Sequence, residues 1–149
     1  SKNLKMIRLT IIVIFLTVFS SCTKNHEGST TAANYHGKWT LVKMSGSMFN
    51  SGTTGIEMDW QEFYLFKNDG TITKSRTKNA VKTAVSGTYT AKNNADGLYL
   101  ELTYPKESEL IGSCYGNLKE ELYFPDARTL SSTWKNCDGP GLDYEKVDK

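Results

Sequence analysis

The chain has 149 residues, a length typical of one domain, and 38% of them are hydrophobic. It contains 18 lysines and arginines against 16 aspartates and glutamates, but Lys2, Lys5 and Arg8 precede an apolar run, and without them the balance is 15 to 16. Proteins bind nucleic acid with clustered positive charge, which a near-neutral chain lacks, so we expect no nucleic-acid partner.

The first predicted element is an N-terminal signal peptide over residues 1–21. Its apolar run from Leu9 to Phe19 is shorter than the ~20 residues of a membrane-spanning helix and follows three basic residues. Ser20 and Ser21 lead directly into Cys22, an arrangement that resembles the lipobox of bacterial lipoproteins. The resemblance implies acylation of Cys22 and attachment to a lipid bilayer of the cell envelope, which we expect to be the outer membrane. Plain secretion with a free thiol is the alternative.

A polar segment follows the cysteine. Residues 22–34, which include "TKNHEGSTTAAN", show no apolar period and cannot bury enough surface to order themselves. We predict a flexible tether with an r.m.s. reach of ~20 Å. The folded domain is expected over residues 35–149.

The domain has the pattern of short β-strands. "GKWTLVKMSG" reads as a first strand, and "QEFYLFKNDGTITKSRT" reads as a hairpin about an Asn-Asp-Gly turn. A strand is predicted over 85–91, followed by a turn at Asp96-Gly97 and the clearest alternation of the chain, with Leu98, Leu100, Leu102 and Tyr104 on one face. The only helical turns we expect lie in 46–58 or 105–110.

Three more strands, over 117–124, 129–136 and 142–147, complete a set of eight. Eight short antiparallel strands joined by tight turns predict an up-and-down β-barrel, because closure into a barrel hides the sheet edges. A β-sandwich is the alternative fold. A barrel of this size either fills with side chains or encloses one small ligand.

The segments "YHGKWTLVKM", "FKNDGTIT", "SGTYT" and "LYLEL" resemble small bacterial lipocalin-like lipoproteins over residues 35–147. The resemblance makes Gly37 and Trp39 the glycine and tryptophan of the opening lipocalin motif, with Trp39 closing the barrel floor. It also implies a basic residue packed on that tryptophan, for which Lys146 and Arg128 are the candidates.

We therefore expect a barrel that binds a small hydrophobic ligand. Alternation of inward and outward side chains predicts the lining residues. These are Phe63, Leu65, Tyr89, Leu100, Leu102, Tyr104, Leu122, Trp134 and Tyr144. Bulky inward side chains could equally fill the barrel, and the alternative function is then an interaction or structural lipoprotein without an internal ligand.

Two cysteines remain once Cys22 is assigned to the anchor. Cys114 and Cys137 would usually bond in an oxidising compartment, and two separate buried thiols are the alternative. We expect no metal site, because His26 and His36 lie far back in the chain and match no ligand spacing.

We also expect no cofactor and no catalysis. No nucleophile elbow or phosphate-binding loop is present, and Glu120 and Glu121, as neighbours on a strand, must point to opposite faces. The bases of "KSRTKNAVK", which are Lys74, Arg76, Lys78 and Lys82, are interpreted as a solvated face around a turn.

Overall fold

The computed structural model describes residues 34–46, 48 and 50–147. The predicted signal peptide, Cys22 and all of the predicted tether before residue 34 lie outside these ranges, so acylation of Cys22 stays a prediction. Within the described ranges, no helix has both the length and the apolar character needed to cross a membrane.

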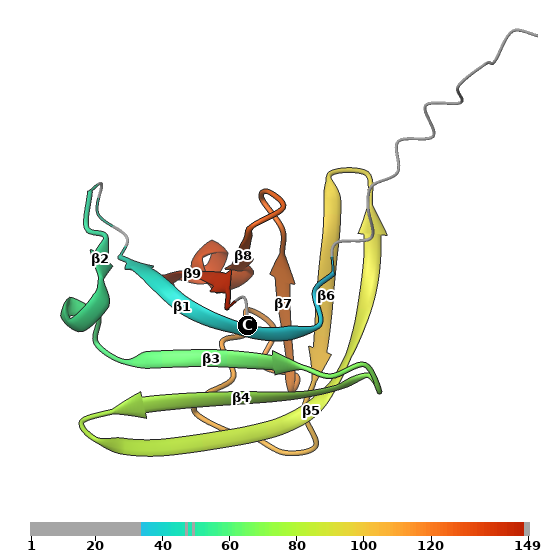
Figure 1. Ribbon diagram of the computed structural model, residues 1–149, viewed down its shortest axis with the longest axis horizontal. Helices are drawn as coiled ribbons and strands as arrows, with labels where there is room; N and C mark the ends of the chain where they lie inside the picture. Colours follow the sequence, from blue (N-terminus) through green and yellow to red (C-terminus); the bar gives the residue numbers. More distant parts are fainter. Residues whose placement is uncertain (1–33, 47, 49, 148–149) are drawn as a thin grey trace, which may run out of the picture. The chain divides into compact units, whose positions relative to one another are not determined.

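One antiparallel sheet forms the body of the protein and closes on itself (Figure 1). Its strands are β1 Gly37–Ser45, β2 Thr53–Thr54, β3 Gln61–Phe66, β4 Thr71–Lys78, β5 Val81–Asn94, β6 Gly97–Thr103, β7 Lys119–Tyr123, β8 Thr129–Ser132 and β9 Gly141–Lys146. Each strand from β3 to β9 pairs with the next, and β1 pairs with both β3 and β9. Eight strands therefore form a closed barrel, to which the two-residue β2 is added beside β1. The predicted eight-stranded up-and-down barrel is confirmed, and the sandwich alternative is wrong.

The ladder between β1 and β9 closes the barrel. It runs from the pair Trp39 and Lys146 to the pair Ser45 and Gly141, and its register shifts between Leu41 and Lys43. A bulge of this kind bends a strand and increases its twist. β1 can therefore curve from β3 across to β9.

The β3–β4 turn has the chemistry that its sequence predicts. Gly70 adopts a φ of +81°, which costs glycine little. The Asp69 carboxylate accepts hydrogen bonds from the backbone N–H of Thr71 at 2.9 Å and from its hydroxyl at 2.6 Å, and these bonds lower the pKa of Asp69. The β4–β5 turn, by contrast, is made by Asn79 and Ala80, both with positive φ. β5 consequently starts earlier than predicted, at Val81.

Two short 3-10 helices interrupt the strands. η1 (Gly55–Glu57) lies in a segment where a helical turn was expected, whereas 105–110 is not helical. η2 (Thr133–Cys137) replaces the second half of the strand predicted over 129–136. The Ser132 hydroxyl accepts a hydrogen bond from the backbone N–H of Trp134 at 3.1 Å, which caps η2 and ends β8.

The two ends of the barrel differ in their connections. We call the end that carries Asn34, the β3–β4 and β5–β6 turns and the last residues of β9 the Asn34 end. The opposite end carries the β4–β5 turn, η2 and the long connection 104–118 between β6 and β7, and we call it the disulfide end.

Candidate functional site

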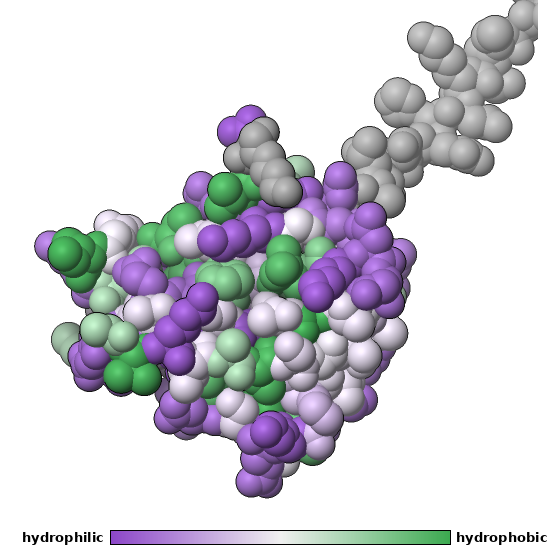
Figure 2. Space-filling model, turned by 60° about the horizontal axis from the view of Figure 1, so that its bottom comes forward, coloured by the Kyte–Doolittle hydropathy of each residue, from purple (hydrophilic) through white to green (hydrophobic). Residues whose placement is uncertain are grey.

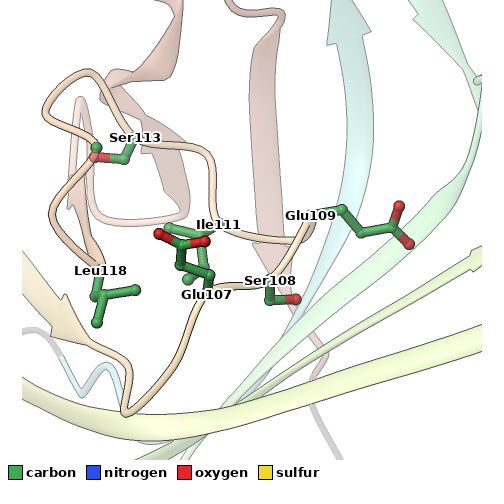
Figure 3. A pocket seen from close by; sticks show the side chains of 7 residues that line it. Glu107, Ser108, Glu109, Ile111, Ser113 and Leu118 are labelled. Carbon is green, nitrogen blue, oxygen red and sulfur yellow. The ribbon is translucent and has the colours of Figure 1, made fainter.

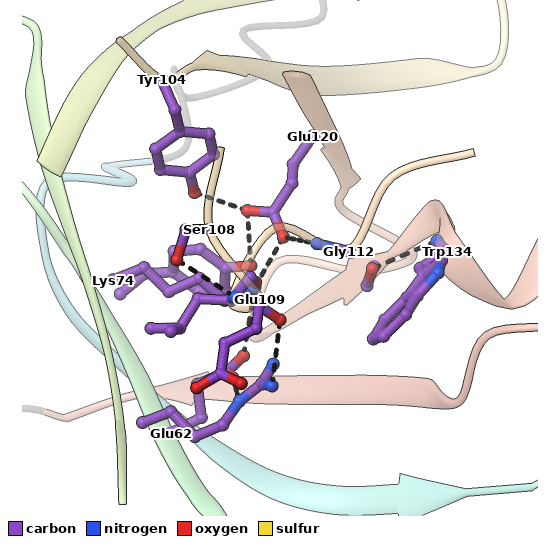
Figure 4. Close-up of polar contacts among 12 residues, drawn as sticks. Glu62, Lys74, Tyr104, Ser108, Glu109, Gly112, Glu120 and Trp134 are labelled. Atoms are coloured by element: carbon purple, nitrogen blue, oxygen red, sulfur yellow. Dashed lines mark hydrogen bonds and ion pairs between the residues drawn. The ribbon is translucent and has the colours of Figure 1, made fainter. Parts of the chain in front are cut away.

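Charged side chains occupy the barrel interior near the disulfide end (Figure 4). Lys74 on β4 places its Nζ 2.5 Å from Oε1 of Glu120 on β7 and 3.5 Å from Oε1 of Glu62 on β3. Arg76, two residues further along β4, donates from Nε to Oε2 of Glu62 at 2.6 Å. The side chains of Lys74, Glu62 and Glu120 are at most 1% exposed, and that of Arg76 is 11% exposed. We call these four residues the interior charge network; two acids balance two bases.

Three tyrosines donate hydrogen bonds to the two carboxylates of the network, while Nη2 of Arg76 is buried without a partner among the described residues. Tyr144 donates to Oε1 of Glu62 at 2.5 Å, while Tyr104 and Tyr64 donate to Oε2 of Glu120 at 2.5 and 3.1 Å. Burial first, and then the nearby carboxylates, raise the pKa of all three phenols well above its ordinary value. The hydroxyls therefore remain donors throughout the neutral range, as a buried carboxylate requires.

The 104–118 connection covers the network and is bonded to it. Lys74 Nζ donates to the backbone carbonyl of Leu110 at 2.5 Å, and the backbone N–H of Gly112 donates to Oε1 of Glu120 at 2.5 Å. Leu110 itself is 2% exposed. The base of the connection is joined by a bond from the N–H of Tyr104 to the carbonyl of Leu118 at 2.9 Å. This segment thus acts as a plug on the barrel.

A disulfide fixes the plug to η2. Cys114 and Cys137 are bonded, with their Cα atoms 5.6 Å apart, so the predicted disulfide is confirmed. Trp134 packs beside the bridge: a Cβ on Gly139 would lie 2.4 Å from its ring, and one on Gly112 would lie 2.6 Å from it. Glycine at both positions lets the tryptophan hold the two segments together.

The Asn34 end of the interior is apolar and aromatic. Phe124 packs edge-on against Trp39 with ring centroids 5.4 Å apart, and Phe66 packs in the same way against Tyr89 at 5.0 Å. The Trp39 indole donates to the carbonyl of Tyr35 at 2.9 Å. Trp39 is 2% exposed and therefore lies in the core, as its predicted structural role requires.

The residues expected around Trp39 are placed as follows. Gly37 has a φ of +114°, and a Cβ there would lie 3.2 Å from Cε of Lys146. Lys146 is opposite Trp39 in the β1–β9 register, but its ammonium donates to the carbonyl of Asn34, and in the described part of the chain it makes no cation–π contact. Arg128 lies in the β7–β8 connection.

Most of the predicted lining residues are buried in the barrel. Leu100, Leu102, Leu122 and Tyr144 have no exposed surface, while Tyr104 and Tyr89 are 2% and 8% exposed. The alternation of β6 and β9 was thus interpreted in the correct phase. These side chains pack in one continuous core that also includes Tyr64, Phe66 and Ile72.

The prediction that Phe63 and Leu65 point inward is wrong. Both are only half-buried, and the buried residues of β3 are Glu62, Tyr64 and Phe66. β3 carries apolar or aromatic side chains on both faces, so alternation alone could not decide its phase. Outside the barrel the Phe63 ring is covered by the ammonium groups of Lys38, 4.4 Å from its centroid, and Lys82, 5.9 Å away.

Two further predictions need correction. Trp134 is not on an inward strand face but on η2, half-buried beside the disulfide. The interpretation of Lys74 and Arg76 as a solvated face is wrong, because both side chains lie inside the barrel and only Lys78 and Lys82 are exposed. Lys74 and Arg76 share the phase of the buried Ile72, and this signal could have identified them.

A pocket opens on the outer surface of the plug (Figure 3). It has a volume of about 490 Å³, and its lining includes Glu107, Ile111, Ser113 and Leu118. Elsewhere, on the face drawn in Figure 2, apolar side chains form separate groups among polar ones. Among the described residues, no three His, Cys, Asp or Glu side chains are grouped to hold a metal ion.

The barrel therefore offers two distinct environments, a filled interior and a pocket on the plug. As the prediction requires, Glu120 faces the interior, while Glu121 on the opposite face of β7 does not.

No protein-family model matches this chain, and no curated protein sequence matches it.

Proposed function

We propose that this protein is a lipid-anchored lipoprotein of the bacterial cell envelope whose barrel is filled by its own side chains, and that it acts by binding at its surface. The observation that carries the proposal is the interior charge network together with the plug bonded to it. This choice favours the surface-interaction function over the internal carriage of a small hydrophobic ligand, and it assigns the protein no catalysis.

The energetics of the network argue against an internal apolar ligand. A ligand in the half of the interior that holds the network would have to displace the plug and so break the bonds from Lys74 to Leu110 and from Gly112 to Glu120. The freed charges would then lie against an apolar surface without compensation, which costs several kcal/mol per ion. Apolar ligand sites are instead lined mainly by hydrophobic and aromatic side chains with few polar groups.

The positions of the chain ends support display of the disulfide end. Asn34, the described residue nearest in sequence to Cys22, lies at the opposite end of the barrel. The segment that leads to Cys22 therefore joins the barrel at the end away from the plug. Attachment by more than one acyl chain is stable, whereas a single chain binds only marginally.

An apolar-probe titration tests the filled interior. We expect the folded domain, residues 35–149, to show no saturable binding of the fluorescent fatty acid cis-parinaric acid. The Leu100→Trp variant, which adds bulk at a fully buried position, is the matched comparison. Saturable binding to the wild-type domain that is lost in Leu100→Trp, with the circular dichroism spectrum unchanged, would show that the barrel is a ligand carrier.

A separate experiment tests the anchor. In a bacterial host, the chain with its N-terminal segment should be labelled by radioactive palmitate and sediment with membranes. Cys22→Ala should abolish both, and Ser29→Ala, a change in the same polar segment, should abolish neither. A Cys22→Ala protein that is cleaved correctly and still partitions into membranes contradicts the anchor.

A further inference from the structure

Hydrogen bonds and a disulfide hold the segment that forms the walls of the pocket on the plug. It lies between the two arms of the 104–118 connection, and the plug below it is bonded to Lys74 and Glu120. The disulfide from Cys114 to Cys137 fixes the far arm. A site whose walls are already ordered does not lose affinity to ordering of loops on binding. Its volume of about 490 Å³ falls within the range of small-molecule sites, ~300–1,000 Å³.

The lining of the pocket combines negative charge with apolar surface. Glu107, Ile111 and Leu118 all line the pocket, while Glu109 lies at the margin with its carboxylate turned away from them (Figure 3). Among residues 34–46, 48 and 50–147, no lysine, arginine or histidine lines the pocket. Within the described part of the chain, neither glutamate takes part in a salt bridge.

The nearest cations in the sequence do not neutralise this carboxylate. Lys119, which follows Leu118, pairs with Glu101 with 3.2 Å between Nζ and Oε1. Lys106 is exposed and is not a lining residue. In the described ranges, Glu107 is therefore an exposed carboxylate without a salt bridge in a pocket that two aliphatic side chains also line.

We propose that this pocket binds an alkylammonium group, that is, a primary ammonium on an unbranched aliphatic stem. The ammonium lies at the carboxylate of Glu107 and the stem packs between Ile111 and Leu118. Two sources share this chemistry, the side chain of a lysine in a partner protein and a free aliphatic diamine. The inference rests on the proposed function, because it names the ligand class for the surface that the filled barrel displays.

The affinity for an isolated alkylammonium ion is modest. The pocket is open to solvent, so one charge pair contributes little beyond the apolar contact. We expect a dissociation constant of about 1–10 mM for n-butylammonium, a cation with only five heavy atoms. The affinity falls with added salt, because exposed charges are screened.

Titration of the oxidised domain, followed by 1H–15N NMR, measures this binding. n-Butylammonium chloride should shift the amide signals of Ser108, Ile111 and Gly116 with saturation, and 1-butanol at equal concentration should leave them unchanged. Glu107→Gln should weaken binding at least about fivefold. Glu145→Gln removes an exposed carboxylate from β9, outside the pocket, and should leave the dissociation constant unchanged.

The outcomes separate the two sources and the two proposals. Tighter binding of Nα-acetyl-lysine-N-methylamide than of 1,5-diaminopentane identifies a lysine side chain as the ligand, and the reverse order identifies a free diamine. Absence of saturable shifts, or equal weakening by Glu107→Gln and Glu145→Gln, overturns the alkylammonium site. The proposed function fails on a different result, saturable binding of cis-parinaric acid inside the barrel.

Discussion

The two halves of the barrel interior are held together by different forces. Toward the Asn34 end, Trp39, Phe66, Tyr89 and Phe124 pack as aromatic pairs with few polar contacts. Toward the disulfide end, four charged side chains and three tyrosines are joined by hydrogen bonds and ion pairs. Apolar packing tolerates substitutions of similar size, whereas a buried charge depends on one particular partner. In the apolar half, many packing contacts therefore share the stabilisation of the fold. In the charged half, the stabilisation depends on particular pairs of residues.

The largest effect should come from breaking the network at its centre. Lys74→Met keeps the length of the side chain but leaves Glu120 and Glu62 without their shared cation, and removal of one partner of a buried ion pair costs about 3–5 kcal/mol. Urea unfolding followed by circular dichroism measures the loss.

A compensating variant distinguishes charge from packing. Lys74→Met combined with Glu120→Gln removes one charge of each sign, so it should recover part of the lost free energy of unfolding. A double variant no more stable than Lys74→Met alone would show that the ion pair is not the cause.

A substitution in the apolar half should lower the free energy of unfolding by less, and no second substitution of a charge should restore it. Leu100 is fully buried on β6, and Leu100→Ala should lower the free energy of unfolding by about 3 kcal/mol through lost contacts and a cavity. Because no charge is exposed or lost, the decrease should be the same at 50 mM and 500 mM salt. A decrease that changes with salt would mean that the two halves are coupled more strongly than their contacts indicate.

The disulfide connects the plug to the rest of the polar half. Replacing both Cys114 and Cys137 by serine should lower the free energy of unfolding by about 2–3 kcal/mol, since the bridge closes a loop with a sequence separation of 23. Thermal unfolding of the double variant, with the reduced wild-type protein as comparison, measures the loss. If neither differs from the oxidised protein, the hydrogen bonds of Leu110 and Gly112 hold the plug by themselves.

The smallest effect concerns an exposed ion pair outside the barrel. Hydrogen bonds from Lys92 and then Lys119 lower the pKa of Glu101 below its ordinary value. The stabilisation is therefore present above the unfolded pKa and lost as pH falls through the folded pKa. Glu101→Gln should cost about 0.5 kcal/mol at pH 7 and nothing at pH 2.5, measured by urea unfolding at both values. A difference that persists at pH 2.5 would have to come from packing.

The same contrast explains what could be predicted from the sequence. In the apolar half, β6 was readable because Leu98, Leu100 and Leu102 alternate with more polar residues, and one phase alone buries the leucines. The closed barrel followed from the number of strands and the tight turns.

The polar half could not be predicted in this way. Glu120 on β7 meets Lys74 from 46 residues away in the sequence, and no local pattern indicates that such charges are partners inside a barrel. In β3 the pattern favoured Phe63 and Leu65 as inward residues, whereas Glu62, which pairs with Arg76 across the β3–β4 hairpin, lies inward instead. A turn was expected between Lys74 and Lys82, but the start of β5 directly after Asn79 and Ala80 was not, because alanine seldom adopts positive φ.

Barrel closure also has a consequence for the order in which the chain can fold. β1 pairs residue 39 with residue 146, so one side of the first strand stays unpaired until the last strand has been synthesised. Contacts of such sequence separation form slowly, because the entropy of a long loop is lost before the contact is gained. A nascent chain that ends before β9 would expose β1 and β8 as free sheet edges, which can pair with other chains. Synthesis of β9, rather than of any local segment, therefore sets the moment at which the barrel can close.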